Sequence, residues 1–422
     1  MAYVGTASGI GGATNASARA APRVWEIAGA ALCLVQFSEP LFAAIAQSQG
    51  LAEPPGFARI FFAPVYAFLA YVAWRDRALA WRAALAAPLL LSLLGLAFAS
   101  TLWSIDSGAT LRRSVWLGAT MLFALYLAWR FAWRDLVQVL AAAFLVLIAG
   151  SYLVAIVAPG VGTMPVEHPG AWSGLWTHKN TLGGLMALAV ALNVAAAIAA
   201  PQRRRLWIGA ACAAFGLIVL STSKTALVAA LLGVAIIAAC ALMRRGPIET
   251  LLVSAGLAIA ASLAATVVIL APDILVAMLG RDLTLTGRTD IWDAAAPAVA
   301  AQPWLGYGYY AFWLPEAGPA YYVREAVRWQ VASAHSGWLE TALALGRAGV
   351  ALFALQFAAS MLRGARSIFD PVAGLWAPAF LAAFAMYTLS ESHVLQANNL
   401  FWLIYVAVTA RLALDAAERR AQ

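Results

Sequence analysis

Residues 174–188 read GLWTHKNTLGGLMAL, and they place His178, Lys179 and Asn180 directly before an apolar run long enough to cross a membrane. The whole chain shares this apolar character, because 64% of its 422 residues are hydrophobic and 11% are charged. That balance lies far outside the range of soluble domains. A spanning helix needs about 20 apolar residues. The sequence therefore predicts an integral membrane protein in which the three polar residues mark the start of a span.

Apolar segments of this length recur along the chain and predict an all-α polytopic fold with about twelve transmembrane helices. We expect spans one to nine within residues 23–271 and spans ten to twelve within 338–414. Residues 272–337 are rich in aromatic side chains and predict a folded, mainly helical periplasmic loop region. Residues 1–22 and 415–422 would be cytoplasmic tails. The expected spans are 24–46, 57–74, 84–103, 114–131, 135–158, 181–200, 206–221, 225–243, 248–271, 338–362, 371–390 and 398–414.

The basic residues predict the orientation of these helices, because short cytoplasmic loops carry most of the Lys and Arg of a membrane protein. Alternate loops hold most arginines, whereas all four histidines and both lysines fall on the opposite side. We therefore expect both termini in the cytoplasm and the His and Lys side chains at the external face. A net charge of +8 could indicate a nucleic-acid partner. Because the arginines lie mainly in short alternate loops, they indicate helix orientation in a membrane instead, and nucleic acid is not an expected partner. The arginines assigned to cytoplasmic loops are Arg75, Arg77, Arg82, Arg130, Arg134, Arg203, Arg204, Arg205, Arg244, Arg245, Arg363, Arg366, Arg419 and Arg420.

Two further classes of feature are not indicated. No apolar stretch precedes Ala16–Ala21, so we expect no cleaved signal peptide. Cys33, Cys212 and Cys240 lie inside apolar spans and are interpreted as small packing residues, not as disulfide or zinc ligands.

The His-Lys-Asn stretch is expected at the external start of the sixth span. The exposed N–H groups and positive dipole of a helix N-terminus favour an anion, and Lys179 adds a full charge while Thr177 or Asn180 caps the helix. The alternative is an ordinary interfacial Lys that extends its amine to the membrane surface.

The turn LSTSKTA, residues 220–226, repeats this arrangement between the seventh and eighth spans. Lys224 begins a helix among hydroxyl groups, including that of Ser223. This pattern favours a second set of anion donors at the same face, although Ser and Thr also cap helices without any ligand.

Three arginines depart from the orientation rule and fall on the external side. Arg112 and Arg113 are adjacent, and a tandem pair can bind an anion through forked hydrogen bonds. Salt bridges with Asp106 are an equally simple explanation. Arg59, at the outer end of the second span, is added to this group.

The region after the ninth span contains further polar candidates. Arg288 follows a glycine at an expected helix start, where the dipole disfavours a cation unless an anion accompanies it. That anion is either a substrate or one of Asp290 and Asp293. The surrounding Trp and Tyr residues are interpreted as sugar platforms or as interfacial residues.

His335 is expected beside the external start of the tenth span. A neutral imidazole accepts a proton from a hydroxyl near pH 7, although a lone His is also commonly a hydrogen-bonded structural residue. Glu340 and Arg347 would lie within the tenth span, facing the protein interior because lipid exposure is costly, and we expect them to pair.

Five motifs, in this order and on one predicted face, resemble the bacterial O-antigen ligase and polymerase superfamily and are most similar to its ligases. They are HKNTLGG (178–184), STSKTAL (221–227), LTGRTDIW (285–292), PWLGYGYYAF (303–312) and HSGWLETALALGRAG (335–349). The resemblance implies a GT-C-like, metal-independent, inverting glycosyltransferase of the bacterial inner membrane, without a cofactor. Its donor would be a glycan on undecaprenyl diphosphate, and its acceptor would be lipid A-core. Membrane lipid is a further expected partner, because the donor's polyprenyl tail would lie along the apolar spans.

The resemblance also implies roles for individual residues. The family's basic positions fall on Lys224 and Arg288, and its functional histidine on His335. This sequence departs from the family pattern at Lys224, where many relatives carry Arg, and at Ser336, which replaces a frequent Asn.

The chemistry of the residues agrees with this function. No DxD motif occurs in the external loops, and Asp290 and Asp293 are three residues apart beside Arg288, so no divalent-metal site is indicated. Fixed cations would then stabilise the charge that grows on a leaving diphosphate. His335 would orient or deprotonate the acceptor hydroxyl, and His178, Ser223 and Glu340 would support the site. The expected cations are Lys179, Lys224, Arg288, Arg112, Arg113 and Arg59, with Asn180 beside them.

Three alternatives remain open. An O-linked protein oligosaccharyltransferase and an O-antigen polymerase share these motifs and differ only in the acceptor. A transporter of lipid-linked glycans would also place cations on a membrane path. Neither an internal repeat nor a matching pair of broken spans favours the transporter.

Overall fold

The computed structural model describes residues 22–40, 42, 45, 62–164, 168–270, 286–314 and 318–421. Apart from one pair of two-residue strands, its regular elements are helical. Arg59 lies outside the described residues, as do the end of the first predicted span and the start of the second. The elements in chain order are α1 (Val24–Phe37), α3 (Ala63–Arg75), α4 (Arg77–Ala86), α5 (Pro88–Ala99), η2 (Ser100–Leu102), α6 (Ser107–Arg130), α7 (Trp133–Val157), α8 (Pro159–Gly162), β1 (Thr163–Met164), β2 (Ala171–Trp172), α9 (Lys179–Ala199), η3 (Pro201–Arg203), α10 (Arg204–Ser221), α11 (Lys224–Met243), α12 (Pro247–Leu270), α14 (Thr286–Ala301), α15 (Pro319–Val327), α16 (Gly337–Arg366), α17 (Ala373–Ser390) and α18 (Leu400–Arg420).

Every predicted span overlaps one of these helices, and the chain is an all-α polytopic membrane protein. Within the described residues, seven helices are long and apolar enough to cross a membrane, or eight if the bent pair α4 and α5 forms one span. α1 is only 14 residues long, and α6 carries three arginines. The expected number of about twelve spans therefore stays a prediction.

The third predicted span, residues 84–103, is not a straight helix. Its first residues belong to α4, which is bent by 93° from the helix that follows. Pro88 occupies the first turn of α5, where its missing N–H is tolerated, whereas it would interrupt a continuous helix. Pro88 therefore explains why residues 84–103 form two helices instead of the single span that their apolar pattern predicts.

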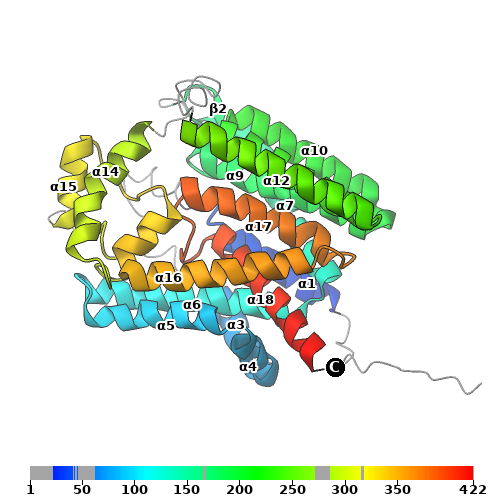
Figure 1. Ribbon diagram of the computed structural model, residues 1–422, viewed down its shortest axis with the longest axis horizontal. Coiled ribbons are helices and arrows are strands. Elements are labelled where there is room, and N and C mark those ends of the chain that lie inside the picture. Colours follow the sequence, from blue (N-terminus) through cyan, green and yellow to red (C-terminus); the bar gives the residue numbers. More distant parts are fainter. Residues whose placement is uncertain are drawn as a thin grey trace, which may run out of the picture.

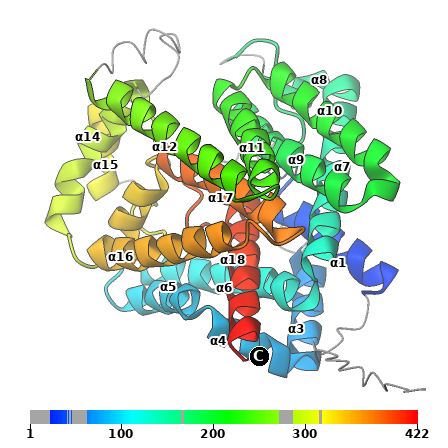
Figure 2. The same ribbon diagram turned by 45° about the vertical axis from the view of Figure 1, so that its right-hand side comes forward.

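The termini of several helices lie at the same end of the bundle (Figure 1). α9, α11, α16 and α18 begin at this end, and α10 and α17 finish there; we call it the site end. Figure 1 shows α14 and α15 at the left of the view, where α16 begins, with the C-terminus towards the right. Figure 2 separates α14 and α15 from the group of α7, α9 and α10. α9 and α18 are the most deeply buried spans and form the centre of the bundle.

The tenth predicted span is broken near its start, at Gly346. This residue has φ 62° and ψ −161° inside α16, a conformation essentially restricted to glycine. A Cβ there would lie 2.3 Å from the carbonyl carbon of Trp304. The break frees backbone groups, and the loop at residues 303–308 pairs with them. Tyr307 N–H donates to the Leu343 carbonyl at 2.9 Å, and Arg347 N–H donates to the Pro303 carbonyl at 2.8 Å.

The described part of residues 272–337 is folded into helices and turns. α14, α15, the intervening turns and the first turns of α16 share a small core that is separate from the main core of the bundle. Trp292 and Trp313 pack at its edge. Its buried members are Ile291, Ala295, Tyr307, Phe312, Ala320, Val323, Val331, Ala334 and Leu343. The hydrogen bonds at the break in α16 and the packing of this core together hold the loops that contain the polar candidate residues.

Candidate functional site

Arg288 and His335 meet on one carboxylate at the site end, Glu391. The Arg288 Nη2 donates to Glu391 Oε1 at 2.8 Å, and His335 Nδ1 lies 3.6 Å from Glu391 Oε2. Arg288 comes from the first turn of α14, His335 from the loop before α16, and Glu391 from the end of α17. The structure thus joins three segments that are distant in sequence, and we call these residues the carboxylate-bridged triad.

The environment of the triad favours the ionised form of its carboxylate. Burial alone would raise the pKa of Glu391, but the contact with His335 and the charge of Arg288 outweigh it and hold the pKa below its usual range. The side chain of Glu391 is 22% exposed and that of Arg288 20%. A charged pair in such a partly dry site interacts more strongly than one on an open surface.

The backbone holds His335 in an unusual conformation. Its φ is 49°, which places a non-glycine residue in the left-handed region. The residue before it is anchored on both sides: the Ala334 N–H donates to Glu340 Oε1 at 2.7 Å, and the Trp292 indole donates to the Ala334 carbonyl at 2.8 Å. Ser336 then caps α16. Strain held by such contacts is typical of functional sites.

A second histidine lies near Glu391 but has a different environment. His393 stacks on Phe401 with ring centroids 4.0 Å apart and planes 7° apart, and the Asn399 amide nitrogen lies 3.3 Å from its Nδ1. Removal from water lowers the pKa of His393 to about 4. It is therefore neutral at pH 7 and serves as a packing residue beside the triad.

The two lysines begin neighbouring helices. Lys179 and Lys224 are the first residues of α9 and α11, and the Ser223 hydroxyl donates to Asn180 Oδ1 at 3.1 Å across these helices. A Cβ on Gly183 would lie 2.8 Å from the Ser223 Cβ, so the missing side chain permits this close approach. His178, rather than Thr177 or Asn180, caps α9 through Nδ1.

The lysine-bearing helices are linked to the triad by packing. A Cβ on Gly184 in α9 would lie 3.2 Å from Phe401 and 3.5 Å from the Tyr387 hydroxyl. Both of these aromatic residues contact the His393 ring. The first turn of α9 and the loop after Glu391 therefore belong to one packed end of the molecule.

The tandem arginines on α6 have separate environments. Arg113 lies over the Tyr310 ring at 4.1 Å and over the Trp116 ring at 4.9 Å, a favourable cation–π geometry. Arg112 is exposed. Asp106, the alternative partner considered for both arginines, caps α6 by accepting from the Ala109 N–H at 2.9 Å.

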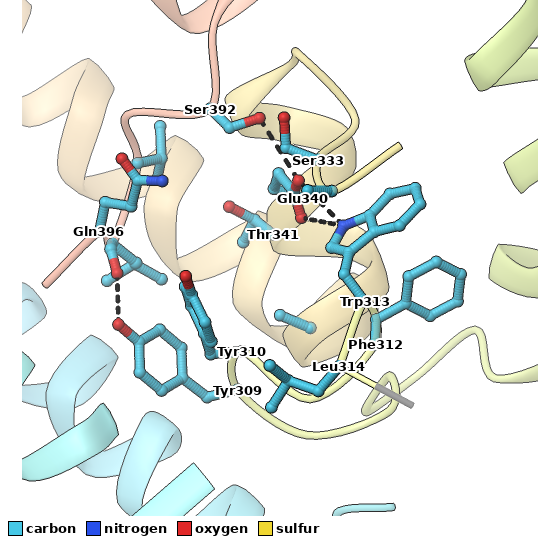
Figure 3. Close-up of a pocket in the computed structure, with 14 residues that line it drawn as sticks. Tyr309, Tyr310, Phe312, Trp313, Leu314, Ser333, Glu340, Thr341, Ser392 and Gln396 are labelled. Atoms are coloured by element: carbon cyan, nitrogen blue, oxygen red, sulfur yellow. Dashed lines mark hydrogen bonds between the residues drawn. The ribbon is translucent and has the colours of Figure 1, made fainter. Parts of the chain in front are cut away.

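A cavity of about 420 Å³ is lined by residues that neighbour the triad in sequence, and Figure 3 shows its lining side chains. Trp313 and Glu340 face Tyr310 and Gln396 across it. The Trp313 indole donates to both Glu340 oxygens at 3.0 Å, and the Ser392 hydroxyl donates to Glu340 Oε1 at 3.4 Å. Two of the lining residues are close in sequence to the triad: Ser333 is two residues before His335, and Ser392 directly follows Glu391.

The expected ion pair between Glu340 and Arg347 is wrong. Glu340 accepts from the Ala334 N–H, the Trp313 indole and the Ser392 hydroxyl. Arg347 follows the non-helical Gly346, which interrupts the helix between the two residues, and lies over the Trp304 ring at 5.2 Å. The carboxylate that bonds Arg288 is Glu391 rather than Asp290 or Asp293.

Sequence reasoning overlooked Glu391 and the role of Trp313. A signal for Glu391 was available, since ESH, residues 391–393, places a carboxylate and a histidine at the external end of the eleventh predicted span. Within the described residues, no three His, Cys, Asp or Glu side chains are grouped so that they could hold a metal ion. Metal independence stays a prediction.

These features define a class, a polytopic α-helical membrane protein with a charged site and an aromatic cavity at one end of the bundle. Residues 210–354 match the O-antigen ligase family, a segment that includes Lys224, Arg288 and His335. The exopolysaccharide production protein ExoQ of Rhizobium meliloti (strain 1021) is 31% identical over 180 residues, 40% of this chain and 41% of that relative. The chain thus matches about two fifths of the length of this relative. These two matches support the resemblance to the O-antigen ligase and polymerase superfamily over the segments that they cover.

Proposed function

We propose that this protein is an inverting, metal-independent glycosyltransferase that moves an O-antigen glycan from undecaprenyl diphosphate to lipid A-core at the periplasmic face of the bacterial inner membrane. The observation that carries this proposal is the carboxylate-bridged triad. It sets a cation and an imidazole side by side, which suits a reaction in which an anionic group leaves while a hydroxyl loses a proton.

In the proposed reaction, an acceptor hydroxyl oxygen bonds to the anomeric carbon of the donor sugar from the face opposite the diphosphate. The bond between that carbon and the phosphate oxygen breaks, and its electron pair stays on the diphosphate. Attack from the opposite face inverts the configuration. The hydroxyl proton passes to His335, which later releases it to water.

The triad geometry suggests how His335 would accept that proton. Glu391 faces Nδ1, and a carboxylate there favours the tautomer in which Nδ1 carries hydrogen. Nε2 is then the basic nitrogen available to the acceptor. Glu391 would also stabilise the imidazolium that forms. In this scheme Glu391 is a positioning residue, because it acts through His335 and Arg288.

Arg288 would stabilise the leaving diphosphate. A guanidinium has five N–H donors, so it can hold Glu391 and a phosphate oxygen together. Lys179 and Lys224, with the N–H groups at the starts of α9 and α11, would hold the remaining phosphate charge. Preorganised donors of this kind are among the largest contributors to catalysis.

A second candidate function is glycan polymerisation, in which the acceptor is a second lipid-linked glycan. The similarity to a protein named for exopolysaccharide production favours it. The triad chemistry is the same for both acceptors. Protein oligosaccharyltransferase and transporter activities have no comparable observation in their favour.

Reconstitution into liposomes with a glycan on undecaprenyl diphosphate tests both candidates. The acceptor would be lipid A-core or a second lipid-linked glycan, and products would be separated by gel mobility with EDTA present. We expect a product in EDTA, and its loss in Arg288→Ala and His335→Ala. Arg328→Ala, which removes an exposed arginine of the same external region, is the matched control and should retain activity.

Each outcome of this assay distinguishes one candidate function from the others. Product with lipid A-core alone identifies the ligase, and lengthened glycan alone identifies the polymerase. Movement of labelled glycan across the liposome without any covalent product would identify a transporter. Inhibition by EDTA that added Mg²⁺ reverses would contradict the metal-free mechanism.

A further inference from the structure

The cavity beside the triad has the chemistry of a sugar-binding site rather than a phosphate-binding site. Its described lining contains aromatic, carboxylate, amide and hydroxyl groups and no Lys or Arg. Its volume of about 420 Å³ lies within the range of about 300–1,000 Å³ that is typical of small-ligand pockets. A diphosphate needs cations, and here it would meet a carboxyl group instead.

The walls of the cavity suit a sugar ring. Trp313 and Tyr310 present aromatic surfaces, on which the C–H face of a sugar can pack. Arg113 lies over the Tyr310 ring at 4.1 Å and holds it in place. Glu340, Gln396 and Ser392 supply groups that hydrogen-bond to hydroxyls, and Glu340 is itself fixed by the Trp313 indole.

The position of the cavity relates it to the reacting groups. It is formed by segments at residues 309–314, 332–344 and 392–396, whereas the phosphate donors assigned in the proposed reaction, Lys179, Lys224 and Arg288, come from α9, α11 and α14. Glu340 binds the N–H of Ala334, the residue next to His335. A sugar held on Glu340 would therefore lie close to the imidazole that accepts the hydroxyl proton.

We propose that this cavity binds an unphosphorylated sugar ring of the acceptor glycan and presents its hydroxyl to His335. This inference rests on the proposed glycosyl transfer for its direction, but binding of a sugar can be measured without transfer. Trp313 is the main platform, and Glu340 positions both Trp313 and the backbone next to His335.

Two variants test the cavity in different ways. Trp313→Ala removes the platform. Ala332→Trp blocks the cavity from its rim, and because Ala332 is exposed, this change adds bulk without removing a packed side chain. Trp329→Ala removes another tryptophan, 48% exposed, that does not line the cavity, and it is the matched control.

Binding is measured on purified protein with three labelled probes: delipidated core oligosaccharide, a released repeat-unit glycan, and undecaprenyl diphosphate without sugar. We expect the wild type to bind at least one of the two free glycans. Trp313→Ala should weaken that binding at least roughly tenfold, because it removes the aromatic ring on which the sugar packs. Ala332→Trp should also weaken it at least roughly tenfold, because the added indole fills the space that the sugar would occupy. Undecaprenyl diphosphate binding should change less than about twofold.

The outcomes separate this inference from the proposed function. Glycan binding that both variants leave unchanged, or that the wild type lacks, overturns the sugar site even if transfer is observed. Glycan binding that both variants weaken supports the site even if the reconstituted wild type transfers nothing. In a transfer assay, a raised KM for the acceptor with an unchanged KM for the donor supports the acceptor assignment. The reverse pattern overturns it in favour of the donor's own sugar.

Discussion

The two ends of the helical bundle treat their arginines differently. At the end opposite the site, Arg75 bonds Asp76 at 2.6 Å and lies 3.5 Å from Glu26, which also pairs with Arg130. Two cations there meet two carboxylates. At the site end, Arg288 and His335 share the single carboxylate of Glu391. Charge is balanced within the cluster of Arg75, Arg130, Glu26 and Asp76, whereas the triad carries a net positive charge when His335 is protonated.

Two further arginines at the opposite end are also held by groups of the protein. Arg411 pairs with Asp415 and lies 3.3 Å from Glu418, and Arg244 donates to the carbonyls of Ile368, Asp370 and Pro371. These arginines are bound by the protein itself and connect neighbouring helices. The comparison teaches that a cation is a functional candidate only when its environment leaves it capacity for a ligand. The abundance of arginine in a loop carries no such information.

Substitution of Glu391 at the site end is expected to lower the transfer rate most. Glu391→Gln keeps the shape but removes the charge that orients His335 and balances Arg288. We expect the transfer rate to fall by about 10²-fold, within the range of acid–base contributions, with a changed pH profile. The measurement is the rate against pH in reconstituted membranes. A uniform loss at every pH, with an unchanged profile, would indicate a purely structural role for Glu391.

The same variant gives a stability prediction whose sign follows from the pKa of Glu391. The folded-state pKa is lowered, so the pair with Arg288 adds stability above the usual carboxyl pKa of 4.5 and loses it as pH falls through the folded value. Wild type should therefore have a higher apparent Tm than Glu391→Gln at pH 7, and the difference should shrink in acid. An equal difference at pH 7 and below pH 4.5 would contradict this.

Substitution of the lysines should have a smaller effect than that of Glu391. Lys224→Ala should raise the KM for the lipid-linked donor by roughly tenfold, since a hydrogen bond to a charged group is worth about 1.5–3 kcal/mol. Lys224→Arg keeps the charge and is the matched control. Steady-state kinetics with the donor varied would check this. An unchanged donor KM in both Lys179→Ala and Lys224→Ala would remove the two helix starts from the phosphate site.

Much of the fold was predictable because it depends on local apolar length. The helix starts at Lys179 and Lys224 were correct for the same reason, since each polar cluster stands directly before an apolar run. The break in α16 was not predictable: the segment at residues 338–362 has the length and composition of a continuous span despite Glu340 and Arg347, and Gly346 is non-helical where the loop at residue 304 approaches it. Such pairing is a tertiary event.

The candidate site was predictable only in part. Arg288 and His335 came from motifs, but their shared partner is 103 residues from Arg288, and no local pattern connects them. The expected pairing of Glu340 with Arg347 failed for a related reason. Sequence spacing gave no account of Trp313, whose indole approaches Glu340 from another loop. Long-range polar contacts determine this site, whereas local hydrophobicity determines the bundle.

The smallest effect is expected at the opposite end of the molecule. Arg75→Ala removes a cation whose side chain is 29% exposed, so the cost should be at most about 1 kcal/mol, seen as a small fall in apparent Tm. The transfer rate and the donor KM should stay within about twofold of wild type, because Arg75 is already occupied by Asp76 and Glu26 and lies at the end away from the triad. Activity is compared at a temperature where both proteins are folded. A loss of transfer as large as that in Glu391→Gln, at full folding, would show that the balanced end also takes part in the reaction, and the distinction between the two ends would fail.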